Sequence, residues 1–308
     1  MPASKLTLWQ KIKRERTSYL MLLPNVILFC VFTIYPLLWV MRYMFYDYRG
    51  YGEPVFVGLA NFQRVFRDTV FWAAVENTFV YVFGKLILTI PIAFMLAFLL
   101  QKNTKFNAVS QSIVFTPTIM SQAVMALIFY LLFNTYNGEI NYMLKSVGII
   151  DQNVNWLGVN LAMVTVIILA VWGGVGNYMV YFIAGLTGIS TDVYESARLD
   201  GANAVQTLFK ITLPLLAPVL KMILMLALVV SFHDMQSIMV LTEGGPMNAT
   251  NVMFLYIYQL FFPISAGSTV IQEFGYGAAV SLVAACIVGI FTGIYLILGK
   301  KLDSITEG

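Results

Sequence analysis

Six apolar stretches, each of a length that suits a membrane span, constrain the fold of this 308-residue chain more than any other feature. A spanning helix needs about 20 consecutive apolar residues, because the hydrocarbon core of a bilayer is roughly 30 Å thick. Only 11% of the residues are charged and 59% are hydrophobic, which sets the chain apart from soluble domains. The stretches are 17–41, 86–101 (completed upstream through Lys85 to about Phe79), 106–133, 161–186, 213–241 (with Lys221, His233 and Asp234) and 278–298. We therefore predict an all-α membrane protein with six transmembrane helices.

The lysines and arginines predict the orientation of these helices. Cytoplasmic loops carry an excess of basic residues, and the basic groups here lie before the first stretch, after the second and after the sixth. They are Lys5, Lys11, Lys13, Arg14 and Arg16, then Lys102 and Lys105, then Lys300 and Lys301. Arg42, Arg49, Arg64 and Arg67 lie on the opposite side, offset by Asp47, Glu53 and Asp68. Both termini of this multi-pass protein are thus expected in the cytoplasm.

This topology divides the chain into a cytoplasmic segment 1–18, a transmembrane domain 19–299 and a cytoplasmic tail 300–308. One apolar run inside the extracytoplasmic loop 242–274 is harder to place. Residues 252–262 are apolar but too few for a span, and Pro263 follows them. We predict a re-entrant or interfacial half-helix there.

The sequence contains little that could carry out catalysis. His233 is the single histidine, so a histidine-based metal site or catalytic triad has almost nothing to work with. No phosphate-binding loop occurs, so the chain alone is not expected to hydrolyse ATP, and we predict a non-catalytic protein without metal or bound cofactor. Cys30 and Cys286 lie in predicted spans. The glycines at 173–176 and the pair Gly289 and Gly293 favour close helix packing.

A polar island at residues 192–214 separates two apolar stretches. Asp192 with Glu195 three residues later is typical of a capped helix start. Gly201 is placed to end that helix in a left-handed conformation, and Asn203 can cap a second short helix through about Lys210. Pro214 then begins the next span. A merely solvated loop is the alternative, but these ordered signals favour a surface that meets a soluble partner.

The island resembles the "EAA" loop of permease subunits in binding-protein-dependent ABC importers. The matching residues are Glu195-Ser-Ala197, Asp200-Gly201-Ala202 and the run from Ile211 to Pro214, with Ser196 departing from the commoner alanine. The resemblance implies the type I ABC importer permease fold, in which loop 189–213 holds a cytoplasmic coupling helix that docks into the ATPase. By the same resemblance, the ATPase-coupling residues are Tyr194, Glu195, Ala197, Asp200, Gly201, Ala202 and Pro214.

Three further motifs look like those of carbohydrate-type permeases. They are residues 56–62, the pairs Phe71-Trp72 and Asn77-Thr78, and residues 241–246. The chain resembles in particular the first of two unlike permeases that pair as a heterodimer in sugar and glycerol-phosphate importers. The resemblance implies a second permease, two ATPase subunits that bind ATP and magnesium, and an extracytoplasmic solute-binding protein. It also implies a place in the bacterial cytoplasmic (inner) membrane. Gly244, Gly245 and Pro246 indicate a turn, which the family resemblance would place against the binding protein or the cavity mouth.

Polar groups at membrane depth are the candidates for a substrate path, because such groups are costly unless they face a cavity or another helix. They are Gln122, Asn177, Tyr181, His233, Asp234 and Gln236. Each one alone is more often a hydrogen bond between helices than a ligand contact, and cavity lining is favoured most for the cluster His233, Asp234 and Gln236. The family's carboxylate lies two residues after Asp234, where this chain has Gln236, so its role does not carry over.

The function that best fits is one membrane-spanning subunit of an ATP-driven importer of a sugar, an oligosaccharide above all, which forms half of the translocation path. A permease for glycerol phosphate or another solute is the nearest alternative. A stand-alone secondary carrier is expected to show acidic residues deep in several spans and an internal repeat, and only Asp234 fits. The basic residues form no cluster for nucleic acid, and the identity of the sugar stays open.

Overall fold

The protein was analysed as a computed structural model, which describes residues 15–262 and 271–306 and the side chains up to residue 299. The chain divides into two compact units, residues 1–67 with 271–283, and residues 68–270 with 284–308. Residues 1–14, 307 and 308, and the side chains of Lys300 and Lys301, lie outside this description. So do residues 263–270, which form part of the predicted loop 242–274. Most of the basic residues that predicted the orientation of the termini are therefore among the residues not described.

The first unit begins with a long apolar helix and continues into a small ribbon. Its elements are α2 (Arg16–Phe29), the π-helical turn η1 (Cys30–Ile34), α3 (Tyr35–Arg42), the 3-10 turn η2 (Tyr43–Phe45), β1 (Tyr46–Asp47), β2 (Val55–Phe56) and α4 (Ala60–Arg67). The strands pair antiparallel, with Tyr46 opposite Phe56. This two-stranded ribbon was not expected from the sequence. The first residues of α15 (Phe274–Thr306) complete the unit.

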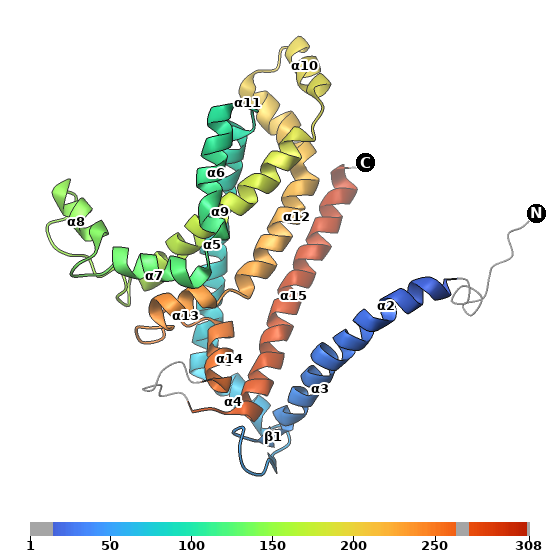
Figure 1. Cartoon of the computed structure of the whole chain (residues 1–308), viewed down its shortest axis with the longest axis vertical. Coiled ribbons are helices and arrows are strands. Elements are labelled where there is room, and N and C mark those ends of the chain that lie inside the picture. The colour runs from blue at the N-terminus through green and yellow to red at the C-terminus, as the bar shows by residue number, and fades with distance from the viewer. Residues whose placement is uncertain (1–14, 263–270, 307–308) are drawn as a thin grey trace, which may run out of the picture. The chain divides into compact units, whose positions relative to one another are not determined.

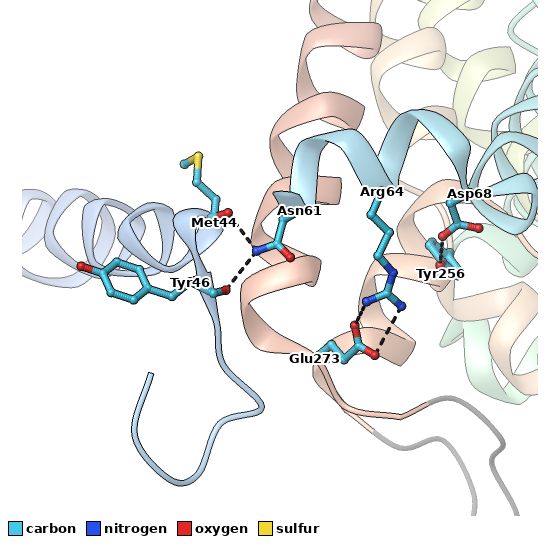
Figure 2. A network of polar contacts seen from close by, with 7 residues as sticks. All are labelled: Met44, Tyr46, Asn61, Arg64, Asp68, Tyr256 and Glu273. Atoms are coloured by element: carbon cyan, nitrogen blue, oxygen red, sulfur yellow. Dashed lines mark hydrogen bonds and ion pairs between the residues drawn. The ribbon is translucent and has the colours of Figure 1, made fainter. Parts of the chain in front are cut away.

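Polar side chains hold the ribbon, α4 and the start of α15 together within the first unit (Figure 2). The amide of Asn61 donates to the backbone oxygens of Met44 and Tyr46, at 3.0 and 2.9 Å. Arg64 pairs with Glu273 through both guanidinium nitrogens. The guanidinium carbon of Arg64 also lies 3.9 Å from the centre of the Tyr276 ring.

The second unit is a helical bundle. Its elements are α5 (Thr69–Leu100), α6 (Lys105–Ile119), α7 (Gln122–Leu132), α8 (Glu139–Ser146), α9 (Ala162–Thr187), α10 (Thr191–Leu199), α11 (Ala204–Thr207), the π-helical turn η3 (Leu208–Thr212), α12 (Leu213–Phe232), α13 (Gln236–Thr242), α14 (Met253–Phe261) and the rest of α15. Its core lies where α5, α9 and α12 meet, around Ala93, Met179, Phe182, Leu216 and Ile223. Figure 1 shows α10 and α11 at one end of α12 and α13 at the other.

Five helical stretches are long and apolar enough to cross a membrane, and the α6–α7 pair makes a sixth if it counts as one span. The five are Arg16–Phe45, Thr69–Leu100, Ala162–Thr187, Ala204–Phe232 and Phe274–Gly299. The prediction of six apolar spans is therefore confirmed in this form, although several bounds differ. The second span starts at Thr69, ten residues before Phe79, so Lys85 lies well inside it. Within loop 242–274, α14 is nine residues long, and whether it enters a membrane stays a prediction.

Two spans that the sequence predicted as continuous are broken. The stretch 106–133 bends by 97° between α6 and α7. Met120 at the bend has extended backbone (φ −77°, ψ 147°), and the polar Ser121 and Gln122 follow it. The stretch 213–241 ends as a helix at Phe232, and α13 restarts at Gln236. Polar residues stand at both breaks, but apolar residues resume beyond each one and keep the mean hydropathy of the whole stretch high.

Close helix packing is confirmed at the glycines of α9. A Cβ atom on Gly176 would lie 2.5 Å from the backbone oxygen of Val114 and 2.8 Å from the Cα of Phe115, both in α6. Backbones approach this closely only where the side chain is absent, which is the use of small residues between membrane helices. At Gly289 and Gly293, nothing among the described residues lies within 4 Å of a Cβ, so close packing at these two positions stays a prediction.

Candidate functional site

The polar loop 189–213 folds into a capped helix. Ser190, not Asp192, is the N-cap of α10, and its hydroxyl accepts a hydrogen bond from the backbone of Asp192 at 3.3 Å. The prediction of Asp192 as the cap was two residues late. Its carboxylate instead lies in the first turn, where a negative charge stabilises the positive end of the helix dipole.

The helix ends at the predicted glycine. Gly201 has φ +77°, in the left-handed region that favours glycine. The backbone N–H of Ala202 donates to Ala197 at 2.9 Å, and that of Gly201 donates to Arg198 at 3.1 Å. These two bonds form a Schellman motif, which satisfies the last carbonyls of α10. The end of α10 is therefore closed by hydrogen bonds within the loop itself.

The second helix begins as predicted but does not end at Lys210. Asn203 and Gln206 form a reciprocal capping box, with both bonds at 2.9 Å. From there one helix runs without interruption from Ala204 to Phe232, through the π-helical turn Leu208–Thr212. Pro214 lacks the N–H that would continue the α-helical ladder, and the wider turn before it accommodates that loss. The loop is thus joined rigidly to α12.

The loop exposes apolar side chains outside the apolar bundle. Leu199 is 89% exposed, and Val205 and Phe209 are 64% and 63% exposed. Glu195 and Asp200 are also exposed beside them. An ordered, exposed patch of this mixed kind is typical of a protein docking surface. Leu199 was missed from the sequence, where its place between Arg198 and Asp200 gave no sign of such exposure.

The other predicted coupling residues differ in how far they are exposed. Ala197 is 5% exposed, so it packs inside the loop. The hydroxyl of Tyr194 accepts a hydrogen bond from Thr212 at 3.4 Å, which ties α10 to the start of α12. Ala202 is partly buried, and Pro214 is exposed. These residues shape the surface, whereas Glu195, Leu199 and Asp200 present side chains on it.

A second polar site lies at the other end of α12, where the helix breaks. His233 is exposed, its ring nitrogen Nδ1 is 2.8 Å from the backbone oxygen of Val229, and its ring packs on Phe254. Asp234 turns the other way and is buried, with 4% of its side chain exposed. The pair cannot form one catalytic dyad, in agreement with the divergent directions expected for adjacent residues.

The carboxylate of Asp234 is enclosed by three side chains. The ammonium group of Lys85 lies 3.2 Å from Oδ2 of Asp234, and 7% of the lysine side chain is exposed. The hydroxyl of Tyr81, which is fully buried, donates to the same oxygen. Ser237 donates to Oδ1 at 3.1 Å. We call these four residues the α5 clasp, because Tyr81 and Lys85 are one turn apart on α5.

The next turn of α5 holds residues 242–252, which we name the outer turn after the side of the membrane that the sequence predicts for them. The amide of Asn77 donates to the backbone oxygens of Asn248 and Asn251, at 2.9 and 3.1 Å. The hydroxyl of Thr78 accepts from the backbone N–H of Met253 at 2.8 Å. At the start of α5, Asp68 accepts from the hydroxyl of Tyr256 in α14 at 2.6 Å (Figure 2). A polar stripe on α5 therefore binds the chain from Asp234 to Tyr256.

The outer turn is itself closed by hydrogen bonds, which confirms the turn predicted at Gly244, Gly245 and Pro246. Gly244 has φ +85°, and Gly245 and Pro246 are joined by a cis peptide bond. The hydroxyl of Thr250 lies 2.7 Å from that of Thr242 and donates to the oxygen of Gly245 at 2.9 Å. Met247 is 88% exposed at its tip.

The polar residues predicted for a substrate path are only partly brought together. Gln122, Asn177 and Gln236 lie on α7, α9 and α13, three helices that pack on one another. Tyr181 is partly buried against the core, next to Tyr178. Within residues 15–262 and 271–306, none of the hydrogen bonds joins two of the six predicted residues. Lys85, Tyr81 and Ser237 were missed, although a lysine in an apolar span is itself a signal.

A cavity of about 560 Å³ opens between α5, α6 and α9. Its walls are apolar, with Leu88, Ile113, Pro117, Val171 and Trp172 among them. A polar solute would lose its hydrogen bonds to water there and gain none in return, so this cavity does not suit one. None of the six predicted path residues lines it.

Comparison with known proteins identifies relatives of the whole chain. The family model of the binding-protein-dependent transport system inner membrane component matches residues 89–304. The chain is 32% identical to the probable ABC transporter permease protein YesP of Bacillus subtilis, over 91% of this chain and 89% of that one. It is also 32% identical to the arabinooligosaccharides transport system permease protein AraP of the same organism, over 93% and 90%. The trehalose/maltose transport system permease protein MalF of Thermococcus litoralis is 31% identical, over 96% and 98%.

Among solved structures, a bacterial ABC transporter involved in the import of the acidic polysaccharide alginate contains a similar chain. The TM-score is 0.79 at 23% identity, and the match covers 96% of this chain and 98% of that one. A bacterial alginate ABC transporter in complex with alginate pentasaccharide-bound periplasmic protein gives a TM-score of 0.81. At this identity the likeness establishes the fold, which is that of an ABC importer permease.

Proposed function

Because this chain belongs to the family of binding-protein-dependent transport system inner membrane components, we propose that it is one of two unlike permease subunits of an ATP-driven oligosaccharide importer. It is a multi-pass protein of the inner membrane. Relatives that cover nearly the whole chain are named for arabinooligosaccharides and for trehalose and maltose, which supports a carbohydrate as the solute. The single observation that supports a soluble partner protein is the capped helix of loop 189–213 with its exposed apolar and acidic side chains.

That surface is suited to an ATPase subunit. The Schellman motif and the capping box fix the loop before any partner binds, so docking orders little additional chain. Leu199 would enter an apolar pocket of the ATPase, while Glu195 and Asp200 would meet its polar rim. ATP and magnesium would be bound by the ATPase, and this chain would bind neither.

The solute would pass between this chain and the second permease. Neutral hydrogen-bonding groups suit a sugar, and Gln122, Asn177, Tyr181, His233 and Gln236 are the residues we propose for the path. We leave Asp234 out, because both of its oxygens already bond within the chain. An extracytoplasmic binding protein would deliver the solute near the outer turn, where Gly244, Gly245 and Pro246 lie.

The transport cycle follows from this arrangement. Closure of two ATPases on ATP would draw the two coupling loops together. The paired permeases would then open outward to receive the solute, and hydrolysis would return them to the inward-open state. The driving force would come from ATP, and the permease would contribute the geometry of the path.

The test is a charge reversal on the docking surface. We expect Glu195→Lys to lower copurification of the ATPase and ATP turnover stimulated by the loaded binding protein, each by about tenfold. Glu53→Lys is the matched control, because Glu53 is an exposed glutamate outside the loop. Maltose, trehalose, lactose and arabinotriose would each be added as the solute for the importer's extracytoplasmic binding protein. If Glu195→Lys kept wild-type levels in both assays, the docking assignment would be wrong.

A further inference from the structure

The α5 clasp lies where a long helix ends, and that position suggests a mechanical role. The helix from Ala204 to Phe232 has 29 residues, so it is roughly 43 Å long at 1.5 Å per residue. It begins at the exposed loop and ends two residues before Asp234. A displacement of the loop would therefore arrive at Asp234 along one continuous helix.

The break after Phe232 would act as a hinge if nothing held it. Residues 233–235 are not helical, and only α13 and the outer turn lie beyond them before α14. The clasp holds this break from the side, because Lys85 and Tyr81 grip Asp234 while Ser237, in the first turn of α13, donates to the same carboxylate. Asn77 and Thr78 hold the outer turn to the next turn of α5.

An ion pair buried at a helix break has a large desolvation cost. Both members of the ion pair are more than nine-tenths buried, and a pair of matched apolar side chains would serve stability as well or better. An ion pair differs from apolar contacts because it fixes one partner at one position. The chain thus contains a directional joint at the point where α12 must act on the outer turn.

We propose that Lys85 and Asp234 are positioning residues that transmit movement of the loop at residues 189–213, through α12, to α5 and the outer turn. This inference rests on the proposed function, since it takes the ATPase as the source of the movement. The two residues need not contact the solute. Without the joint, the loop and α12 would move while the outer turn did not follow.

The experiment follows the outer turn directly and needs no solute. Cys30 and Cys286 are replaced by serine, and Met247→Cys places a thiol at the exposed tip of the turn. The permease pair with its ATPase is reconstituted in lipid. The rate of modification by a membrane-impermeant maleimide is then measured without nucleotide and after trapping with ATP and vanadate. In the otherwise unchanged protein we expect trapping to change the rate by at least about threefold.

The decisive variant is Lys85→Met with Asp234→Asn, which leaves no buried charge unpaired. We expect this double variant to retain the ATPase and hydrolyse ATP, while the ratio of the two maleimide rates falls to about one. Reversing the pair, with Lys85→Asp and Asp234→Lys, should restore at least about half of the nucleotide effect. Glu76→Gln is the control for the loss of an exposed carboxylate on α5, and it should keep the effect.

A purely structural ion pair gives a different pattern. The neutral double variant would then behave like the parent protein in the maleimide assay, and that result overturns the proposal. Failure of the double variant to assemble with the ATPase also overturns it, because the pair would then be a requirement for folding. The proposal is also overturned if trapping leaves the maleimide rate at the introduced thiol unchanged in the parent protein. Failure of the proposed function would look different again, since no variant, the parent included, would retain an ATPase.

Discussion

The α5 clasp and loop 189–213 are both polar regions of an apolar chain, yet their polar groups find hydrogen-bond partners in different ways. In the clasp, the polar groups lie inside the bundle and their partners are other side chains of this chain. In the loop, the backbone satisfies itself, and Leu199 and Glu195 are left exposed. A polar group that is hydrogen-bonded within the chain stabilises the fold, whereas exposed side chains on a hydrogen-bonded loop are available to bind a partner.

This contrast predicts that substitutions in the clasp lower the stability of the protein against unfolding. Lys85→Met alone leaves Asp234 buried without its counter-ion, at a cost of about 3–5 kcal/mol. We expect a marked fall in the unfolding temperature of the purified protein, followed by tryptophan fluorescence in detergent. Adding Asp234→Asn should recover most of the loss, because no charge then stays unpaired. An unfolding temperature unchanged by Lys85→Met would show that the pair contributes nothing.

Substitutions in loop 189–213 should instead weaken its binding to the ATPase. Leu199→Asp removes an exposed apolar side chain whose burial against a partner is worth about 1.5–3 kcal/mol. We expect the affinity for the ATPase to fall by roughly ten- to a hundredfold, and the unfolding temperature of the isolated protein to stay unchanged. Arg198→Ala, at the neighbouring exposed position of the same helix, is the control and should have the smaller effect on affinity. Equal effects of the two substitutions would remove Leu199 from the docking surface.

Much of this contrast was hidden in the sequence, and the reason is the range of the interactions. Gly201 and Asn203 were predicted correctly because a helix cap depends on residues at most a few positions away. Lys85 and Asp234 are separated by 149 positions, and nothing in a single sequence pairs them. A buried carboxylate in a span is a functional candidate until its partner is seen, which is why Asp234 was first assigned to a substrate path.

The spans show the same limit. Hydropathy found every apolar stretch, because the bilayer imposes a length and a composition. It did not find the bends at Met120 and after Phe232, since only a few polar residues stand at each bend and apolar residues resume beyond them. Asp192 was mistaken for a cap because Ser190 and Asp192 are both good N-cap residues, and only the fold decides between them.

A smaller effect is expected where α5 holds the outer turn. Thr78→Val keeps the shape of the side chain but removes the acceptor for the backbone N–H of Met253. A buried donor left without a partner costs about 1–3 kcal/mol. Thr78→Ser retains the hydroxyl and should unfold within a few degrees of the parent protein. If the valine and serine variants unfolded at the same temperature, this hydrogen bond would not stabilise the turn.

The smallest effect is expected from the cap of α11, and it sharpens the contrast most. Asn203→Ala removes the acceptor for Gln206 in the exposed loop, and the loss of such a cap costs about 1 kcal/mol. Because the loop lies outside the bundle, we expect faster hydrogen exchange at residues 204–207 with no change in the unfolding temperature. Asn203→Asp keeps the acceptor and should exchange like the parent protein. A fall in the unfolding temperature with Asn203→Ala would mean that the loop and the bundle unfold as one unit, and the division between a region that holds the fold and a region that offers a surface would no longer stand.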